Sequence, residues 1–199
     1  MTATFLLIRH AMHTDYGHRF TGRTDGVRLS PAGEEQARSL AERLGDVELA
    51  AIYASPRERC RATASFLAAS RSLEVEIAPD LDEIDLGDWT GREIDSLRGD
   101  PAFDRWNTER STAAPPNGEP FAAVAERSHA LARALAAKHA DTIVALATHQ
   151  DVIKALVATC LGLSLDHVLR FDIGPASVSR LVLGDWGAKL LTLNEWAAG

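Results

Sequence analysis

Two apolar runs, each followed by a histidine, limit the folds open to this chain more than any other feature of its sequence. Residues 4–8 form the first run, and Arg9 and His10 follow it directly. Residues 142–147 form the second run, which leads to His149. Short continuous apolar runs are typical of buried parallel strands. Because open α/β sheets bind ligands at the carboxyl ends of such strands, we expect the two histidines to meet there.

Helical patterns alternate with further short apolar runs along the rest of the chain. Ser30 and Ser55, each followed by proline, are predicted to cap helices, the second with Glu58 completing a capping box. Strands are predicted over 49–54, 74–77, 178–183 and 189–194, with helices over 31–44, 56–69, from 119, and over 151–161. This order predicts a single α/β domain over residues 1–199: a three-layer sandwich with a mostly parallel central sheet, helices on both faces and a C-terminal antiparallel hairpin.

Charge and cysteine content exclude several classes of protein. The 199 residues carry a formal net charge of -7, which gives no support to a nucleic-acid partner. Cys60 and Cys160 each lie inside a predicted helix, so a disulfide scaffold and a paired-cysteine zinc site are not expected. No signal-peptide pattern and no apolar stretch of membrane-spanning length is visible. We therefore expect a cytoplasmic protein with no membrane partner, either a monomer or a homodimer.

Cations gather near the predicted strand ends. The loop 11–29 is rich in histidine and arginine, and Arg57, Arg59 and Arg61 occupy the first turn of the helix after the second strand. Solvated side chains and an anion-binding surface explain these cations about equally well.

The strand ends together suggest phosphoryl chemistry. Arg9 and Arg59 offer planar anchors for a phosphoryl group, and the two histidines add a nucleophile and a donor. Glu83 joins them from the acidic loop 80–91. No nucleotide-triphosphate loop and no aspartate cluster for magnesium is present. A metal-free phosphoryl transfer through histidine fits this set.

Short motifs in order over about residues 5–185 carry a family resemblance. They are Arg9-His10-Ala11, Arg19-Phe20-Thr21-Gly22, Leu29-Ser30-Pro31-Ala32-Gly33, Ser55-Pro56 with Arg59, Glu83 four residues before Gly87, Pro115-Pro116-Asn117-Gly118-Glu119, Thr148-His149 and Pro175-Ala176-Ser177-Val178. With this spacing, the chain resembles the phosphoglycerate-mutase-like branch of the histidine phosphatase superfamily.

The resemblance implies a phosphomonoester hydrolase for a small phosphorylated metabolite, with no cofactor and no metal. His10 would attack and become phosphohistidine. Arg9, Arg59 and His149 would bind the phosphoryl oxygens. Glu83 would protonate the leaving oxygen and later activate water, so its pKa should be raised by burial or by the bound phosphate.

The chain departs from the family pattern at several positions. Met12 and His13 stand where the family often has an acidic residue and Thr or Ser, and Gln150 replaces the glycine after the second histidine. These changes bear on the substrate and on the exact set of contacts, so Gln150 is a candidate substrate contact. The family's phosphate-binding asparagine is missing, and His18 and Tyr16 are candidates to replace it.

Two other functions stay open beside the phosphatase. One is a cofactor-dependent phosphoglycerate mutase, because the loop containing the candidate contacts Arg19 and Thr21 resembles that of the mutases. Against it, Asp85 would repel a substrate carboxylate if it faced the site. The other is a binding protein of the same fold that has lost turnover. The loop 88–118 is expected to roof the site.

Overall fold

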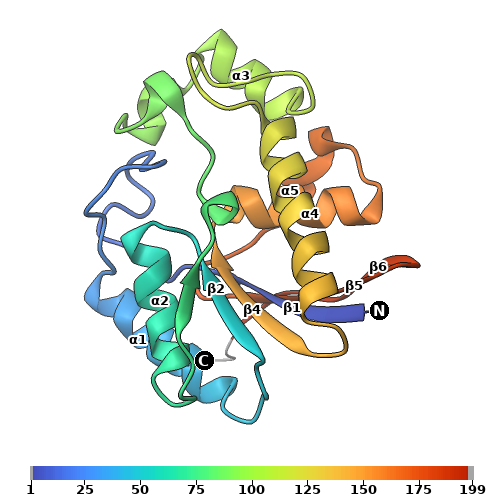
Figure 1. Ribbon diagram of the computed structural model, residues 1–199. Helices are drawn as coiled ribbons and strands as arrows, with labels where there is room; N and C mark the ends of the chain where they lie inside the picture. The colour runs from blue at the N-terminus through green and yellow to red at the C-terminus, as the bar shows by residue number, and fades with distance from the viewer. Residues whose placement is uncertain (1, 197–199) are drawn as a thin grey trace.

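A six-stranded mixed sheet forms the middle layer of the protein (Figure 1). The computed structural model describes residues 2–196. The strands are β1 (Thr2–Arg9), β2 (Ala51–Ala54), β3 (Val75–Ile77), β4 (Ile143–Thr148), β5 (Val178–Gly184) and β6 (Gly187–Glu195), in the order β3-β2-β4-β1-β5-β6. The first four strands in this order are parallel to one another, and β5 and β6 are antiparallel. The predicted sheet and hairpin are therefore confirmed.

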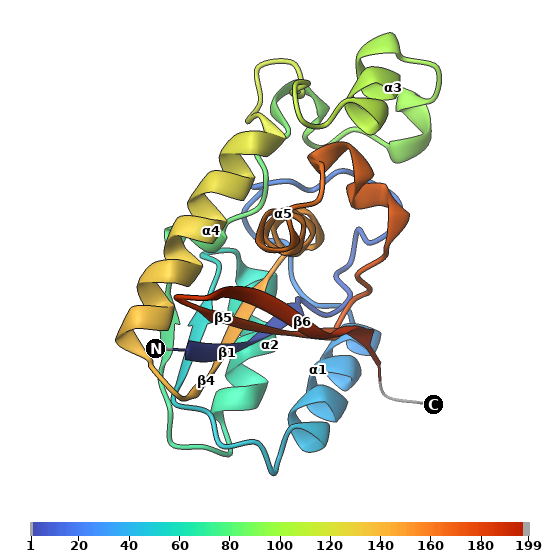
Figure 2. The ribbon, with the colours of Figure 1, turned by 90° about the vertical axis from the view of Figure 1, so that its right-hand side faces the viewer.

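Helices cover both faces of this sheet. Figure 2 shows α4 and α5 on one side of it, α1 and α2 on the other, and α3 beyond the α4–α5 layer. The helices are α1 (Pro31–Arg43), α2 (Glu58–Ala68), α3 (Pro101–Thr108), α4 (Phe121–Lys138) and α5 (Gln150–Leu161), and the 3-10 helices are η1 (Pro79–Leu81), η2 (Gly87–Trp89), η3 (Ile94–Leu97) and η4 (Leu165–Arg170). The expected three layers are present.

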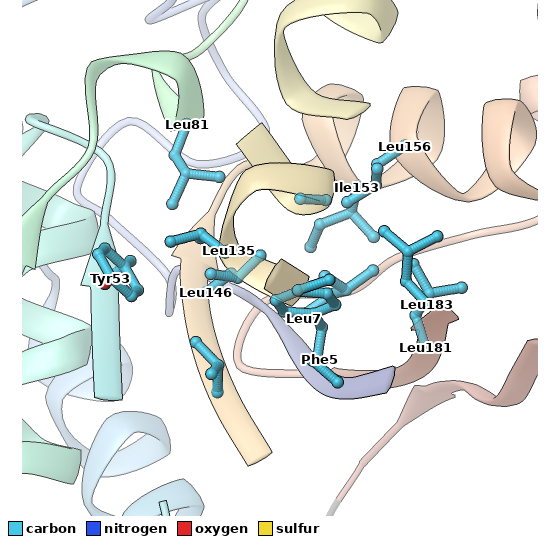
Figure 3. Packing of buried hydrophobic residues seen from close by; sticks show 14 of the residues in the cluster. Phe5, Leu7, Tyr53, Leu81, Leu135, Leu146, Ile153, Leu156, Leu181 and Leu183 are labelled. Carbon is cyan, nitrogen blue, oxygen red and sulfur yellow. The ribbon is translucent and has the colours of Figure 1, made fainter. Parts of the chain in front are cut away.

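The apolar run in β1 is continuous because both faces of this strand are covered. Phe5 and Leu7 pack with Leu156 of α5 in the cluster that Figure 3 shows. Leu6 and Ile8 point to the opposite face, toward α1 and α2. All four side chains are fully buried, and each such burial stabilises the fold by roughly 1.5–3 kcal/mol.

A third apolar cluster joins the segment between β3 and α4 to the main body. We call it the cap cluster: Ile84, Leu86, Trp89, Leu97, Trp106, Ala113, Phe121, Val124, Ala125, Val152, Ala155, Ala158 and Val168. Its members come from η2, η3, α3, α4, α5 and η4, and from the loops that carry Ile84, Leu86 and Ala113. The cap cluster therefore fixes the loop after β3 against the first turns of α4 and α5.

One predicted helix cap is right and the other is wrong. Ser30 caps α1 as expected, since its hydroxyl accepts a hydrogen bond from Gly33 N at 3.1 Å. Helix α2 begins at Glu58, after Arg57, with no side-chain cap. Ser55 Oγ accepts from Arg57 N at 3.3 Å, before the helix begins, and lies 2.8 Å from Nε2 of His149. The local sequence pattern did not include this distant partner.

Candidate active site

The two histidines meet at the carboxyl end of the sheet, as predicted. Strands β1 and β4 are parallel neighbours, and Arg9 pairs in register with Thr148. His10 N donates to Thr148 O at 2.9 Å. The ring centroids of His10 and His149 are 5.2 Å apart. Two strand ends far apart in the sequence thus build one site.

His10 is held as a neutral imidazole with a defined tautomer. Its Nδ1 lies 2.8 Å from Ala11 O, and since a carbonyl only accepts, Nδ1 carries the proton. Burial lowers the pKa of His10 well below its usual value, and Arg59 and Arg9 lower it further. Nε2 therefore keeps its lone pair, and no side chain within residues 2–196 donates to it.

Two arginines beside His10, the buried Arg59 and the half-buried Arg9, have buried donor atoms without acceptors. Arg59, 1% exposed, donates from Nη2 to Gly22 O at 2.7 Å. Its Nε and Nη1, and Nε of Arg9, have no acceptor in the described part of the chain. Arg9 Nη1 donates to Ile173 O at 2.6 Å. Buried donors are nearly always paired, so these groups are suited to an anionic ligand.

Glu83 and His149 form a buried pair. Oε2 of Glu83 lies 3.3 Å from Nδ1 of His149. Burial raises the pKa of Glu83 to about 7, Asp151 adds to the rise and Arg59 opposes it. Burial lowers the pKa of His149 well below its usual value, and Arg59 and His10 lower it further. Below pH 7 the pair is therefore neutral, with the proton on the carboxyl group.

Arg59 and Ser55 set the tautomer of His149. Nη2 of Arg59 lies 3.2 Å from Nδ1 of His149 and can only donate, so Nδ1 holds the lone pair. The proton of the neutral ring is therefore on Nε2, which donates to Ser55 Oγ at 2.8 Å. The hydroxyl of Ser55 in turn donates to Oδ1 of Asp82 at 3.4 Å.

Three further side chains hold the backbone of Glu83 in place. Its carbonyl oxygen accepts from Arg23 Nε at 2.7 Å and from Arg127 Nη2 at 3.3 Å. Both arginines pair with Glu119, at 2.8 Å and 2.9 Å. The sequence placed Glu119 only within a family motif and gave Arg127 no role. The one sequence feature that pointed to these contacts with Glu83 was the position of Arg23 in the cationic loop 11–29.

The site opens into a cavity of about 300 Å³. Its wall is formed by Arg9, His10, His13, Tyr16, Gly17, Arg19, Phe20, Thr21, Gly22, Glu83, Leu86, Ile94, Gln150 and Asp151. Arg59 and His149 are not part of this wall, and both are fully buried beneath it. His18 lies in an adjoining groove with Glu93 and Asp95. The candidate contacts Arg19, Thr21 and Gln150 therefore reach the cavity, whereas His18 does not.

The acidic residue that faces the cavity beside Glu83 is Asp151 and not Asp85. Asp85 Oδ1 accepts from Gly87 N at 2.9 Å, and Asp85 is not part of the wall. Asp151 is part of the wall, and its Oδ1 accepts from Arg110 Nη1 at 2.9 Å. A carboxylate that sequence reasoning overlooked thus stands beside Glu83, although its position two residues after His149 was a usable signal.

The loop 88–118 packs through the cap cluster, and most of it does not line the cavity. Trp89 and Trp106 are 1% and 2% exposed and lie in the cap cluster. The guanidinium of Arg110 stacks 3.5 Å from the centre of the Trp106 ring. Ile94 is the loop's one residue in the cavity wall. The loop therefore reaches the cavity through Ile94, and Trp89 and Trp106 do not roof it.

Two other expectations bear on ligands and membranes. Within residues 2–196, no group of three or more His, Cys, Asp or Glu side chains is placed to hold a metal ion. Among the helices of the same residues, none is long and apolar enough to cross a membrane.

The fold and the site define an α/β protein with a cavity at the carboxyl end of its sheet, where two neutral histidines and two arginines meet. The profile of the family described as the histidine phosphatase superfamily (branch 1) matches residues 5–195. The chain therefore belongs to the histidine phosphatase superfamily, branch 1.

Relatives of this chain carry the names of phosphatases and of mutases. The adenosylcobalamin/alpha-ribazole phosphatase of Escherichia coli is 30% identical over 174 residues, covering 86% of this chain and 85% of the relative. The solved mycobacterial glucosyl-3-phosphoglycerate phosphatase is similar with a TM-score of 0.88 and 29% identity, over 98% of this chain and 99% of that one. A probable phosphoglycerate mutase of Erwinia tasmaniensis is 27% identical over 182 residues, covering 88% of this chain and 82% of the relative. The family and the phosphatase relatives confirm the predicted class, a histidine phosphatase.

Proposed function

We propose that this protein hydrolyses small phosphomonoesters through a phosphohistidine on Nε2 of His10. One observation carries the proposal: the bare Nε2 of His10 lies beside buried arginine donors that have no acceptor in residues 2–196. A phosphoryl group bound there would satisfy the donors and present its phosphorus to the nitrogen lone pair.

In the first step, Nε2 of His10 attacks phosphorus and the bond from phosphorus to the leaving oxygen breaks. Glu83 gives its proton to that oxygen, so the alcohol leaves neutral. Arg9 meets the phosphoryl oxygens in the cavity wall, and Arg59 and His149 stabilise the developing charge from the floor. The pKa of Glu83 of about 7 supports this role, because a carboxyl group must be protonated to act as the acid.

In the second step, Glu83 is a carboxylate and takes a proton from water as that water attacks phosphorus. The bond from phosphorus to Nε2 of His10 breaks, phosphate leaves, and Glu83 is protonated again. The hydrogen bond from Nδ1 of His10 to Ala11 O is unchanged throughout, so Nε2 recovers its lone pair. A group with a pKa near the working pH can serve as acid and as base in turn.

A phosphoglycerate mutase is the second candidate, and Arg19 and Thr21 in the cavity wall favour it. Asp151 disfavours it, because a carboxylate in the cavity wall would repel the carboxylate of a bound phosphoglycerate. Supplying 3-phosphoglycerate with its bisphosphate primer separates the two candidates. Phosphate release faster than the appearance of 2-phosphoglycerate is expected, and the reverse order would assign the mutase.

Trapping the intermediate tests the proposed nucleophile. Alkaline quenching during turnover of an aryl phosphate should leave a phosphate on His10 that is stable in base and released by acid, and His10→Ala should lose both this label and turnover. His129→Ala, which changes a histidine of α4 outside the cavity wall, should keep both. A chelator should leave the activity intact. Normal turnover by His10→Ala would overturn the mechanism.

A further inference from the structure

The geometry points to His13 as an additional phosphate-binding residue: its Nε2–H donates a hydrogen bond to a phosphoryl oxygen of the substrate held at His10. This inference rests on the proposed function and adds a contact that the motifs of the chain do not assign. It also gives a physical role to one of the positions at which this sequence departs from the family pattern.

His13 stands in the cavity wall beside the attacking residue. It is 7% exposed, and its ring centroid is 5.4 Å from that of His10. Its backbone forms a bridge with Leu29 just before α1, and its ring lies edge-on to Tyr16 at 6.0 Å. The side chain is therefore fixed on both sides, which favours a binding contact over a solvated histidine.

One hydrogen bond sets the tautomer of His13. The backbone N–H of Asp15 donates to Nδ1 of His13 at 3.2 Å. Nδ1 must therefore hold a lone pair, and the proton of the neutral ring lies on Nε2. Within residues 2–196 no acceptor pairs with this N–H. His10 has the opposite tautomer, so the two adjacent rings offer one nucleophile and one donor.

The charged neighbours of His13 keep it neutral. Burial lowers its pKa to about 4, Arg59 and Arg9 lower it further, and Asp15 opposes them. These arginines are the groups proposed to bind the phosphoryl oxygens, so His13 lies on the phosphoryl side of the site. A neutral donor there can bind an anion without competing with the arginines for a counter-charge.

Two amide variants separate the donor from the rest of the ring. His13→Asn can still accept from Asp15 N but cannot reach the position of Nε2. His13→Gln places an amide nitrogen near that position. Calorimetry with inorganic phosphate should give a dissociation constant about tenfold to a hundredfold higher for His13→Asn, the range for a hydrogen bond to a charged group. His13→Gln should recover most of this loss, and the control His129→Asn should bind like the wild type.

Equal phosphate binding by His13→Asn and the wild type would overturn the inference, and so would an equal loss in both amide variants. A measurement on the wild type covers the case in which a variant fails to fold. In NMR spectra of the histidine ring nitrogens, inorganic phosphate should shift the Nε2–H proton of His13 downfield, and an unchanged signal would contradict the contact.

The same experiments separate this inference from the proposed function. If phosphohistidine forms on His10 while phosphate leaves the His13 signal unchanged, only the contact is wrong. If phosphate shifts the His13 signal but no phosphohistidine forms during turnover, the proposed mechanism is wrong and the contact stands.

Discussion

Burial is the largest cause of the pKa shifts of three histidines and one carboxyl group around this cavity. His10, His13 and His149 all have lowered pKa values, and Glu83 has a raised one, with burial the largest cause in every case. The arginines reinforce the shift for the histidines and oppose it for Glu83. Near pH 6 the site therefore holds neutral histidines, a protonated carboxyl group and charged arginines. This is the protonation state that attack on a phosphomonoester requires.

The pKa of Glu83 predicts the pH dependence of the reaction. Because Glu83 must be protonated for the first step, kcat/KM should fall as pH rises through about 7. Glu83→Gln should remove this limb and lower kcat/KM about a hundredfold to ten-thousandfold for alkyl phosphates, with a smaller loss for aryl phosphates, whose leaving groups need less protonation. The measurement is kcat/KM against pH for both substrate types. Equal slowing of both would reassign Glu83 to binding or structure.

Asp151 provides a matched test of the same limb. Its negative charge contributes to the raised pKa of Glu83. Asp151→Asn removes that charge while keeping the size of the side chain, so the fall in kcat/KM should begin at lower pH. If kcat/KM falls at the same pH in Asp151→Asn as in the wild type, a group other than Glu83 causes the fall.

The cap cluster is the element that couples the loop 88–118 to the site. Trp106 is buried within it and stacks against Arg110, which in turn holds Asp151 in the cavity wall. The position of Asp151, a side chain of α5 in the cavity wall, is therefore set by a residue of another segment. The packing of the loop affects the cavity wall through the ion pair between Arg110 and Asp151.

Truncation of Trp106 should destabilise this element. Trp106→Ala removes a buried aromatic side chain, so the free energy of unfolding should fall by about 3–5 kcal/mol in urea titrations. Trp186→Ala is the control, because Trp186 is 60% exposed at the β5–β6 turn and should change stability by less than about 0.5 kcal/mol. Equal effects of the two variants would contradict the assigned packing. Hydrogen exchange should also quicken in α3 in the Trp106 variant alone.

The neutral buried histidines make the stability of the whole protein depend on pH. For a histidine with a lowered pKa, the folded form binds the proton less readily than the unfolded chain. Its contribution to stability is therefore complete above the unfolded pKa of about 6.5 and is lost as pH falls toward the folded value. Glu83 acts in the opposite sense, since its raised pKa of about 7 adds stability as pH falls from 7 toward 4.5.

Because three histidines lose their contribution at low pH and only Glu83 gains one, the protein should lose stability on acidification. The free energy of unfolding, measured in urea, should decrease between pH 6.5 and pH 4, by at most about 1.4 kcal/mol per pH unit for each histidine. His13→Gln should flatten this dependence, because His13 titrates only near pH 4 in the folded protein. A variant with the same slope as the wild type would show that His13 is not held neutral in the folded state.

The sequence by itself determined the parts of this protein that depend on local patterns. The apolar runs before Arg9 and Thr148 defined two strands by their length and composition. Polar residues directly after a strand must emerge at its end, so the meeting of His10 and His149 was predictable once the sheet was predicted to be parallel. The cap at Ser30 was predictable for the same reason, since a helix cap bonds within a few residues.

The tertiary structure decided the features in which a side chain had to choose among distant partners. Ser55 contacts His149, 94 positions away, and Asp151 in the cavity wall is held by Arg110, 41 positions away. The direction of such a side chain depends on contacts with residues tens of positions away, which no local period encodes. The donor tautomer of His13 depends on one backbone N–H in a turn, and only its folded geometry shows which ring nitrogen is free.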